Sequence, residues 1–547
     1  MDANALTEWS DKLFSKRTPV LSLWQEIAEH FYPQRADFTI TRNVGQDFAS
    51  HLTTSYPLIV QRDLGNAISS MLRPRAQEWF QVSVDRTSML DKAGRRWLER
   101  ATTQQRLDMY SKDSQFLRAT KEGDHDFTAF GQTVIQAGMN WRTNRLIYRS
   151  HHLRDCAWCE QDDGQIGAVF RKWKVPLRTA FQYFGVAKMS AQAKRDLDQN
   201  QWAESEFLHC ALPAADYEQI CGPPKNGSPK YPWYSVWIDP KNKHVIEDRG
   251  AWVRGYIIPR FQTVSGSQYA FSPATVAGLA DARLLQAMAL TLLEAGEFAV
   301  RPPLIGAKDV VRGDVQVFAG GMTWIDKDYD ERTGEALRPM MQDKTGLPFG
   351  LEMTRDTREM LTQAFYLNKL SLPQIEKEMT AYEANQRMQE YVRGALPLFE
   401  PAEAEYNGAL CEDTFELLMR AGRFGPTNEI PASIRGADVR FVFESPLHDA
   451  LERQKGIRFK EAAEMIAIAV EMDQSAIDVM DVKLALRDSL AAVGVPSDWS
   501  RDEDEVEQLA QDRLEEQQAQ AMMQQAAAGG QAAEMMGKGA KALAEAA

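Results

Sequence analysis

Two clusters of metal-ligating side chains are the first candidates for chemistry in this sequence. His151 and His152 precede Cys156 and Cys159, and imidazole and thiolate groups are common zinc ligands. In a strand, residues three apart point to opposite faces, so both thiols could not chelate one ion from one strand. No second Cys/His pair follows at zinc-finger spacing. A structural role is therefore favoured over a zinc site.

Asp124, His125 and Asp126 form the second cluster. The three side chains could ligate a metal. We favour instead a solvated loop before a helix that begins near Phe127, with Asp124 or Asp126 as its N-cap. The sequence therefore predicts no metal-binding residue here.

Sequence motifs for catalysis are missing from the chain. It contains no Gly-x-x-x-x-Gly-Lys-Ser/Thr, and Gly537-Lys538-Gly539 lies in a low-complexity tail without a preceding strand. Neither Gly-x-Ser-x-Gly nor His-Glu-x-x-His occurs. We predict no catalytic residue, no cofactor and no enzymatic activity. A cytoplasmic helical enzyme with an unrecognised site is the less favoured alternative.

The stretch from Met379 to Gly422 contains no residue that suggests catalysis. It predicts a helix that begins after a loop, is interrupted once and then resumes. Thr380 and Glu383 have the spacing of a capping box, in which hydroxyl and carboxylate each satisfy a backbone N–H at a helix start. Gly394, Pro397 and Pro401 then interrupt the helix. A second helix is predicted from about Pro401 to Gly422, which suits the position after a helix end.

Composition limits the class of protein. The 547 residues suffice for three or four domains of about 150 residues. A net charge of −14 argues against a static grip on nucleic acid, but not against loose passage of DNA past the protein. Five cysteines indicate a reducing compartment. We expect no signal peptide and no membrane-spanning segment.

Periodicity predicts a mainly α protein with β insertions. Helices are predicted at 21–31, 57–72, 93–110, 126–139, 176–184, 191–202, 272–300, 351–368, 401–422, 450–480 and 482–493. Strands are predicted at 79–84, 146–148, 157–160, 166–173, 233–238, 252–258 and 438–444, with a hairpin turn at Asp162-Asp163-Gly164. Residues 206–270 resemble a small β-containing insertion, in which the aromatic residues of 202–256 suit a partner interface or a β core better than base stacking. Residues 502–547 predict either a long helix or disorder.

Ser272 and Pro273 begin the clearest predicted helix, because serine is a good N-cap and proline suits the first turn. The helix reaches Val300, roughly 40 Å at 1.5 Å per residue. It is apolar almost all round and so needs cover on more than one face. The predicted packing residues are Leu279, Leu284, Leu285, Met288 and Leu292.

The order of the predicted elements along the chain resembles that of the portal, or head-to-tail connector, proteins of short-tailed double-stranded DNA phages, and four segments carry this resemblance. They are the stretch from Leu64 to Pro74 with Trp79-Phe80, the hairpin at Asp162–Gly164 leading through Lys174-Val175-Pro176, the Ser272-Pro273 helix, and the capped helix from Met379 to Gly422. The resemblance covers roughly residues 20–480.

The resemblance implies a portal fold of wing, stem, clip and crown, assembled as a ring of about twelve copies. Carried onto this chain, it implies the following parts: wing at 1–175 and 301–430, stem helices at 176–185 and 271–300, clip at 186–270, and crown with C-terminal tail at 431–547. A tunnel loop at 367–379 would place Lys369 and Lys377 near DNA, although solvent-facing lysines are the plainer interpretation of both.

The same resemblance implies a virion protein at one capsid vertex, assembled in the bacterial cytoplasm. Its expected partners are other copies of itself, the terminase large subunit, a tail adaptor, scaffolding and major capsid proteins, internal core proteins, and double-stranded DNA in the channel, with no membrane. Packaging, motor docking, tail attachment and DNA ejection are the implied functions. Another phage structural protein, such as a scaffold or core component, remains an alternative.

Overall fold

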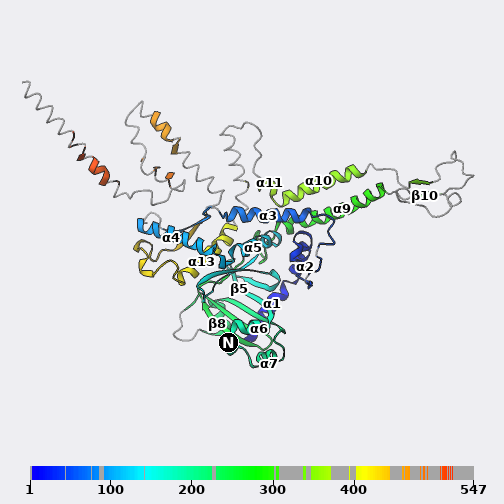
Figure 1. Cartoon of the computed structure of the whole chain (residues 1–547), viewed down its shortest axis with the longest axis horizontal. Helices are drawn as coiled ribbons and strands as arrows, with labels where there is room; N and C mark the ends of the chain where they lie inside the picture. Colours follow the sequence, from blue (N-terminus) through cyan, green and yellow to red (C-terminus); the bar gives the residue numbers. More distant parts are fainter. Residues whose placement is uncertain are drawn as a thin grey trace, which may run out of the picture. The chain divides into compact units, whose positions relative to one another are not determined.

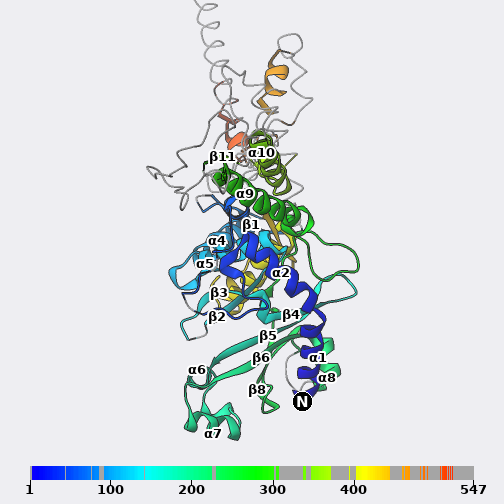
Figure 2. The same cartoon turned by 90° about the vertical axis from the view of Figure 1, so that its right-hand side faces the viewer.

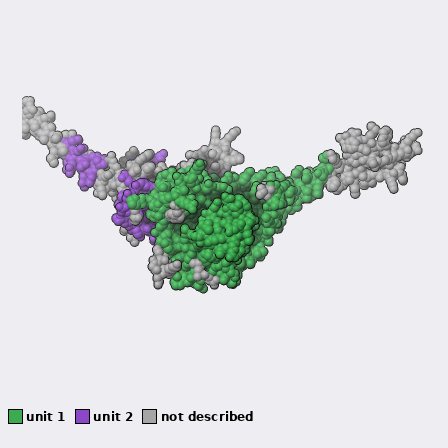
Figure 3. Space-filling view, turned by 60° about the horizontal axis from the view of Figure 1, so that its bottom comes forward, with its two compact units in different colours: residues 1–82, 101–427, 441–448 green, residues 83–100, 428–440, 449–547 purple. Residues whose placement is uncertain are grey.

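A computed structural model describes residues 3–300 apart from 44, 48, 76, 86–90, 141 and 224–229, then 304–306, 337–339, 346–370, 394 and 402–443, and scattered residues between 459 and 520. The chain forms two compact units (Figure 3). Unit 1 comprises residues 1–82, 101–427 and 441–448, and unit 2 comprises 83–100, 428–440 and 449–547.

Helices and strands alternate irregularly along the described residues (Figure 1). The helices are α1 (Ala3–Lys16), α2 (Thr18–Phe31), α3 (Tyr56–Leu72), α4 (Lys92–Met109), α5 (Phe116–Phe130), α6 (Leu177–Phe184), α7 (Ala191–Gln199), α8 (Ala214–Cys221), α9 (Leu279–Val300), α10 (Gly346–Ala364), α11 (Leu367–Leu370) and α13 (Ala409–Arg420). Two π-helical turns, η6 (Ala274–Gly278) and η8 (Glu403–Gly408), lead into α9 and α13. Short 3-10 turns are η1 (Pro33–Arg35), η3 (Lys112–Ser114), η4 (Leu153–Asp155), η5 (Val186–Lys188), η9 (Thr427–Glu429) and η10 (Ala432–Ile434).

The strands are β1 (Phe80–Val84), β2 (Val134–Asn140), β3 (Arg145–His151), β4 (Cys156–Glu160), β5 (Ile166–Pro176), β6 (Glu204–Pro213), β7 (Trp233–Asp239), β8 (His244–Ala251), β9 (Tyr256–Ile257), β10 (Leu304–Gly306), β11 (Leu337–Pro339) and β12 (Val439–Phe443). The largest sheet has the order β4-β5-β6-β7-β8, and a smaller one has the order β3-β2-β9.

The five-stranded sheet is antiparallel throughout, and β6 lies at its centre with Cys210 opposite both Phe170 and Val236. Its apolar side chains form two clusters. One includes residues of α1 and α8, where Trp9 meets the ring of Phe170 edge-on at 5.0 Å. The other includes residues of α6 and α7.

Sequence periodicity predicts several elements well. The helix predicted at 57–72, the strand at 79–84, the Asp162–Gly164 hairpin and the strand at 438–444 are confirmed within a few residues. Ser272 is confirmed as an N-capping group, because its Oγ accepts the N–H of Thr275 at 3.1 Å. Gly422, at φ +69°, is confirmed as the residue after the end of α13. The N–H of Arg423 bonds Leu418 O there, as in a Schellman ending.

The helix predicted at 126–139 is wrong. Helix α5 begins ten residues earlier, at Phe116, and ends at Phe130. Gly131 takes φ +78° and donates its N–H to Phe127 O, and the β-branched run from Thr133 to Ile135 then leads into β2. The apolar residues after Gly131 therefore belong to a buried strand, which periodicity alone does not separate from a helix.

Two further predictions in the β region need correction. The strand predicted at 252–258 is wrong, because β8 ends at Ala251 and β9 contains only Tyr256 and Ile257. The predicted loop-rich insertion at 206–270 contains the long central strand β6, whose residues Phe207–Pro213 are all buried. A strand covered on both faces does not alternate in polarity, which is why periodicity missed it.

Other predictions lie partly or wholly outside the described residues. Gly394 is helical, but the capping box and the two prolines of the predicted helix break fall outside, as do most residues of the helices predicted at 450–493 and of the tail.

In unit 2, Asp91 accepts the N–H of Gly94 at 2.7 Å and the hydroxyl of Ser433 at 2.6 Å.

Helix α13 packs against the smaller sheet of unit 1. The hydroxyls of Thr414 and Tyr148 bond at 2.6 Å, and Asp413 accepts a hydrogen bond from the backbone of Gly255. Burial raises the pKa of the Asp413 carboxyl to about 6, although the nearby Arg254 guanidinium lowers it. Ionised Asp413 is therefore unfavourable in this position.

We expect D413N to be more stable than the wild type at pH 7.5, by ~1–3 kcal/mol. The folded-state pKa lies above the ordinary value of 3.8, so the stabilising contribution of Asp413 is complete below that value and is lost as pH rises through about 6. The asparagine amide still accepts from Gly255. Urea unfolding of both proteins at pH 4 and pH 7.5 measures this difference, and an equal gap at the two pH values would contradict it.

A candidate assembly surface on the α9–α10 hairpin

Helices α9 and α10 lie side by side and extend together away from the helices that cover the sheets of unit 1 (Figures 1 and 2). Their contact is made by small and flexible groups. The Thr357 hydroxyl lies 3.9 Å from the Met288 sulfur, and Gly350 packs against the side chain of Leu292. We call this pair the hairpin, and the part nearest Ser272 its root.

A single amide, that of Gln286, fixes the root to the loop before α3. Its Oε1 accepts the N–H groups of Thr53 (2.8 Å) and Thr54 (3.0 Å), and its Nε2 donates to Thr54 O (2.9 Å). The Thr53 hydroxyl bonds the same side chain at 2.7 Å. Thr53 is exposed and Thr54 is half-buried, so these hydrogen bonds supply direction more than free energy, and they favour one position of α9 against this loop.

Helix α10 is held at the same end of the hairpin. The hydroxyls of Tyr56 and Thr362 lie 2.7 Å apart, and the guanidinium of Arg358 lies over the Tyr56 ring at 5.4 Å. The rings of Phe31 and Phe365 are 5.2 Å apart. These contacts come from α2 and α3. Both helices of the hairpin are therefore anchored in the same region, formed by α2, α3 and the loop before α3.

Burial along α9 changes beyond Gln286. Residues seven apart lie nearly on one line of a helix, because seven residues make almost two turns. Along the line through Gln286, the exposed fraction of Leu279 is 8%, that of Leu293 is 60% and that of Val300 is 81%. The face that the subunit buries at the root is therefore uncovered further out.

Large apolar side chains gather on both helices of the hairpin. The exposed ones are Val276 on η6, Leu284, Leu290, Leu293 and Val300 on α9, and Phe349, Leu351, Met353 and Met360 on α10. Single exposed leucines are ordinary, but a group of this size on two adjacent helices marks a contact surface. The residues of α10 were not among the predicted packing residues. The sequence signal that could have indicated them is the set of apolar residues between 349 and 360.

The predicted packing residues fall into three environments. Leu279 and Leu285 lie in the subunit's own core, Met288 and Leu292 are half-buried against α10, and Leu284 is exposed. By length and composition alone, Ala274–Glu297 could cross a membrane, since it has a mean hydropathy of 1.4. The same apolar content suits a soluble helix that is buried partly by its own chain and partly by a neighbouring molecule.

Lys369 is exposed on α11, with its ammonium group 5.8 Å from the centre of the Tyr366 ring. Residues 367–370 of the predicted tunnel loop are thus a short helix, and Lys377, Thr380 and Glu383 lie outside the described residues. The two predicted stem segments do not come together, because α6 lies at the far end of the sheet from α9 in both Figures 1 and 2.

The histidines and cysteines first considered as zinc ligands have separate partners. His151 Nε2 lies 2.9 Å from Gln136, and His152 Nε2 lies 2.6 Å from Asp37. The thiol of Cys159 donates to Ala168 O, and burial raises the pKa of Cys156 to about 12. Within the part of the chain that the structure describes, no three metal-ligating side chains converge.

Asp124 and Asp126 are not N-caps in a solvated loop, as the sequence suggested, but buried residues inside α5. Asp126 forms a two-point ion pair with Arg35, at 2.9 and 2.6 Å. Asp124 pairs with Arg73. Since Arg35 and Arg73 are distant in sequence, no local pattern showed that these carboxylates were paired.

Arg73 also fixes the turn η8. Its guanidinium donates to Asn407 Oδ1 at 2.8 Å and lies over the Tyr406 ring at 4.4 Å. The pKa of Arg73 is raised despite its burial, because Asp124 and Tyr406 favour its charge. Glu405 of the same turn binds Arg260 at 2.7 Å. The chain is therefore held firmly where it enters α13.

We expect R73M to lose ~3–5 kcal/mol of unfolding free energy, because it leaves the Asp124 carboxylate buried without its partner. The double variant R73M/D124N should recover part of this loss. R62A is the matched control, since the Arg62–Asp63 pair is exposed and should contribute less than about 1 kcal/mol. Chemical unfolding checks all three; equal effects of R73M and R62A would refute a buried anchor.

Comparison with known proteins gives three findings. Residues 3–500 match a family model described as bacteriophage head to tail connecting protein. The portal protein of Salmonella phage epsilon15 is 22% identical over 550 residues, which cover 98% of this chain and 94% of that protein. A chain in the virion of a native gene transfer agent particle has a TM-score of 0.32 and 10% identity, over 75% of this chain and 86% of that chain.

The family match and the similarity to the epsilon15 portal protein confirm the resemblance that the sequence order suggested. The family match runs from residue 3 to residue 500 and includes the whole region of about 20–480 on which the resemblance was based. The protein belongs to the bacteriophage head to tail connecting protein family.

Proposed function

We propose that this protein is a portal subunit, which forms the DNA channel at one vertex of a phage capsid. Family membership supports this role, as does the similarity to the portal protein of phage epsilon15. A portal acts by assembly and passage of DNA rather than by covalent chemistry.

The uncovered outer half of the hairpin is the observation that carries the proposal. The exposed leucines of α9 and the exposed Phe349 and Met353 of α10 would be covered by the next subunit of a ring of about twelve. Burial of such side chains contributes ~1.5–3 kcal/mol each. Because every subunit presents the same surface, the contact repeats until the ring closes.

Two of the proposed parts change when they are compared with the fold. The hairpin α9–α10 supplies the helical pair, so its second helix is α10 rather than α6. The boundary proposed between wing and clip, at 175–186, cuts through the five-stranded sheet that joins β4 and β5 to β6–β8. We therefore propose that this sheet works as one body that carries α6 and α7 at its end.

Partners follow from the role. The terminase large subunit during packaging and a tail adaptor afterwards would dock on the clip at about 186–270, and scaffolding, major capsid and internal core proteins would surround the wing and crown. Double-stranded DNA would pass through the centre of the ring. The virion is the proposed location, after assembly in the bacterial cytoplasm.

Substitution of the outer hairpin should prevent ring formation. L293D places a charge on a side chain that would be buried between subunits, so we expect mass photometry to show monomers where the wild type shows a closed ring. L293M keeps the apolar contact and should keep the ring. L107D is the matched control, because the exposed fraction of Leu107, on α4, is 63%.

This experiment is decisive in either direction. A ring formed normally by L293D would exclude the hairpin as the subunit contact, and a wild-type protein that stays monomeric would count against the portal role itself. Equal loss of assembly in L107D would point to general destabilisation. Circular dichroism of each variant separates that last case from a specific effect.

Lys369 provides a second test. If α11 faces DNA in the channel, K369Q should leave the ring intact but lower the affinity of the ring for double-stranded DNA and reduce its salt dependence, because each phosphate contact releases a counterion. K194Q, on α7, is the control. Filter binding over a salt series would show the change, and identical slopes for wild type and K369Q would remove Lys369 from the channel.

A further inference from the structure

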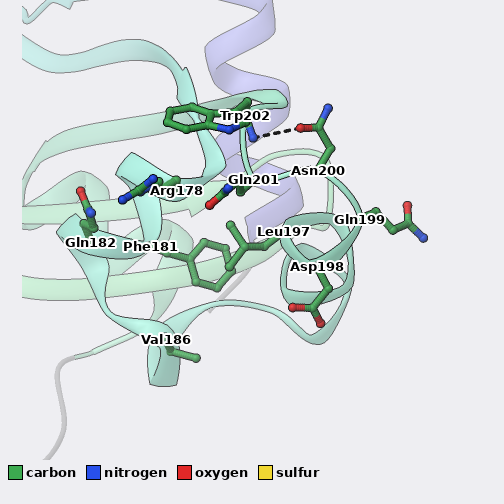
Figure 4. A pocket seen from close by; sticks show the side chains of 10 residues that line it. All are labelled: Arg178, Phe181, Gln182, Val186, Leu197, Asp198, Gln199, Asn200, Gln201 and Trp202. Atoms are coloured by element: carbon green, nitrogen blue, oxygen red, sulfur yellow. Dashed lines mark hydrogen bonds between the residues drawn. The ribbon is translucent and has the colours of Figure 1, made fainter.

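A groove lies at the end of the five-stranded sheet, between α6, α7 and residues 200–202 (Figure 4). Its volume of about 690 Å³ suits one or two amino-acid side chains with their backbone. It lies at the opposite end of the body from the hairpin (Figures 1 and 2). The proposed subunit contact therefore leaves this groove accessible.

The floor of the groove is apolar and rigid. Phe181 is buried in the cluster between α6, α7 and the sheet, and Leu197 packs partly against the same cluster. The segment beside it is fixed by the backbone, since the N–H of Arg178 donates to Gln201 O at 3.0 Å and the N–H of Trp202 to Asn200 Oδ1 at 3.0 Å. The groove is thus preformed.

Two large apolar groups stand exposed at its edge. The exposed fraction is 62% for Trp202 and 61% for Val186. Four amide side chains complete the rim: Gln182, Gln199, Asn200 and Gln201. Each amide offers a donor and an acceptor, which matches the alternating N–H and C=O groups of a peptide backbone. Apolar anchors beside such groups are typical of protein-binding sites.

Arg178 gives the groove its charge preference. Its guanidinium lies over the Trp202 ring at 5.3 Å and makes no ion pair with any residue that the structure describes. A guanidinium stacked on its face keeps the N–H groups of its edge available for a carboxylate. Asp198 also lines the groove, and Arg178 is the only cationic lining residue, which disfavours a polyanionic backbone.

We propose that this groove binds a linear segment of a partner protein that carries a bulky apolar side chain next to an acidic residue. The apolar side chain would lie on Phe181 and Leu197 beside Trp202, and the carboxylate would meet Arg178. The proposal rests on the portal role, in which this end of the sheet is a docking site, and it assigns the chemistry that a docking partner must present there.

The test is selection of peptides on the assembled full-length protein. An mRNA-displayed library of random seven-residue peptides is panned on wild type, W202S and R178E. We expect the wild type to enrich Leu, Ile, Phe or Trp beside Asp or Glu, and R178E to enrich Lys or Arg at the acidic position. W202S should show no such enrichment, because its apolar edge is lost.

Affinity measurement completes the test. Binding of an enriched peptide, followed by fluorescence anisotropy, should weaken about tenfold in R178Q, the typical effect of losing a hydrogen-bonded charge pair. Identical enrichment on wild type and W202S, or basic sequences enriched on the wild type, would overturn the proposal. So would binding of a short fluorescent DNA duplex that R178Q abolishes.

Mass photometry of the same preparations separates this inference from the portal role. The substitutions are at exposed positions far from the hairpin, so W202S and R178E should form the same ring as the wild type. Loss of peptide selection with an intact ring would refute only the groove. A wild-type protein that forms no ring would refute the portal role independently of any peptide result.

Discussion

The subunit buries the apolar side chains at the root of α9 but leaves those of its outer half exposed. This difference in burial along one helix is the constraint on which the other features of unit 1 depend. A helix with apolar side chains on several faces is stable in water only if each face is covered. The core covers Leu279 and Leu285, and α10 partly covers Leu292. Leu293 and Val300 stay 60% and 81% exposed, and in the proposed ring the next subunit would cover them.

Polar contacts determine where that cover begins. Hydrophobic contacts alone would let α9 slide along its neighbours, because one leucine replaces another at little cost. The amide of Gln286 opposes this sliding, since it pairs with both N–H groups and one carbonyl of residues 53–54. The Arg73 cluster does the same for η8. Directional bonds thus fix positions that apolar burial leaves degenerate.

The sequence predicts elements whose signals are local and misses those that depend on distant partners. Ser272 and Gly422 show helix ends within a few residues, so both ends were predicted correctly. The pairing of Asp124 with Arg73 joins residues 51 apart, and local spacing suggested a cap instead. Strand β6 was missed because burial on both faces removes its alternation. The exposed face of the hairpin required knowledge of which leucines the core already covers.

One sequence signal did mark the change from core to surface. Gln286 is the polar residue on a line of seven-residue spacing that otherwise contains Leu279, Leu293 and Val300. In paired helices a polar residue at such a position specifies alignment at some cost in stability. Here Gln286 lies between the part of α9 that the subunit buries in its own core and the part that it leaves exposed to solvent. A closed ring requires every copy to present the same length, because one contact geometry is repeated around the axis. In the proposed ring, a residue that fixes alignment would therefore be as necessary to assembly as the leucines that would supply its free energy.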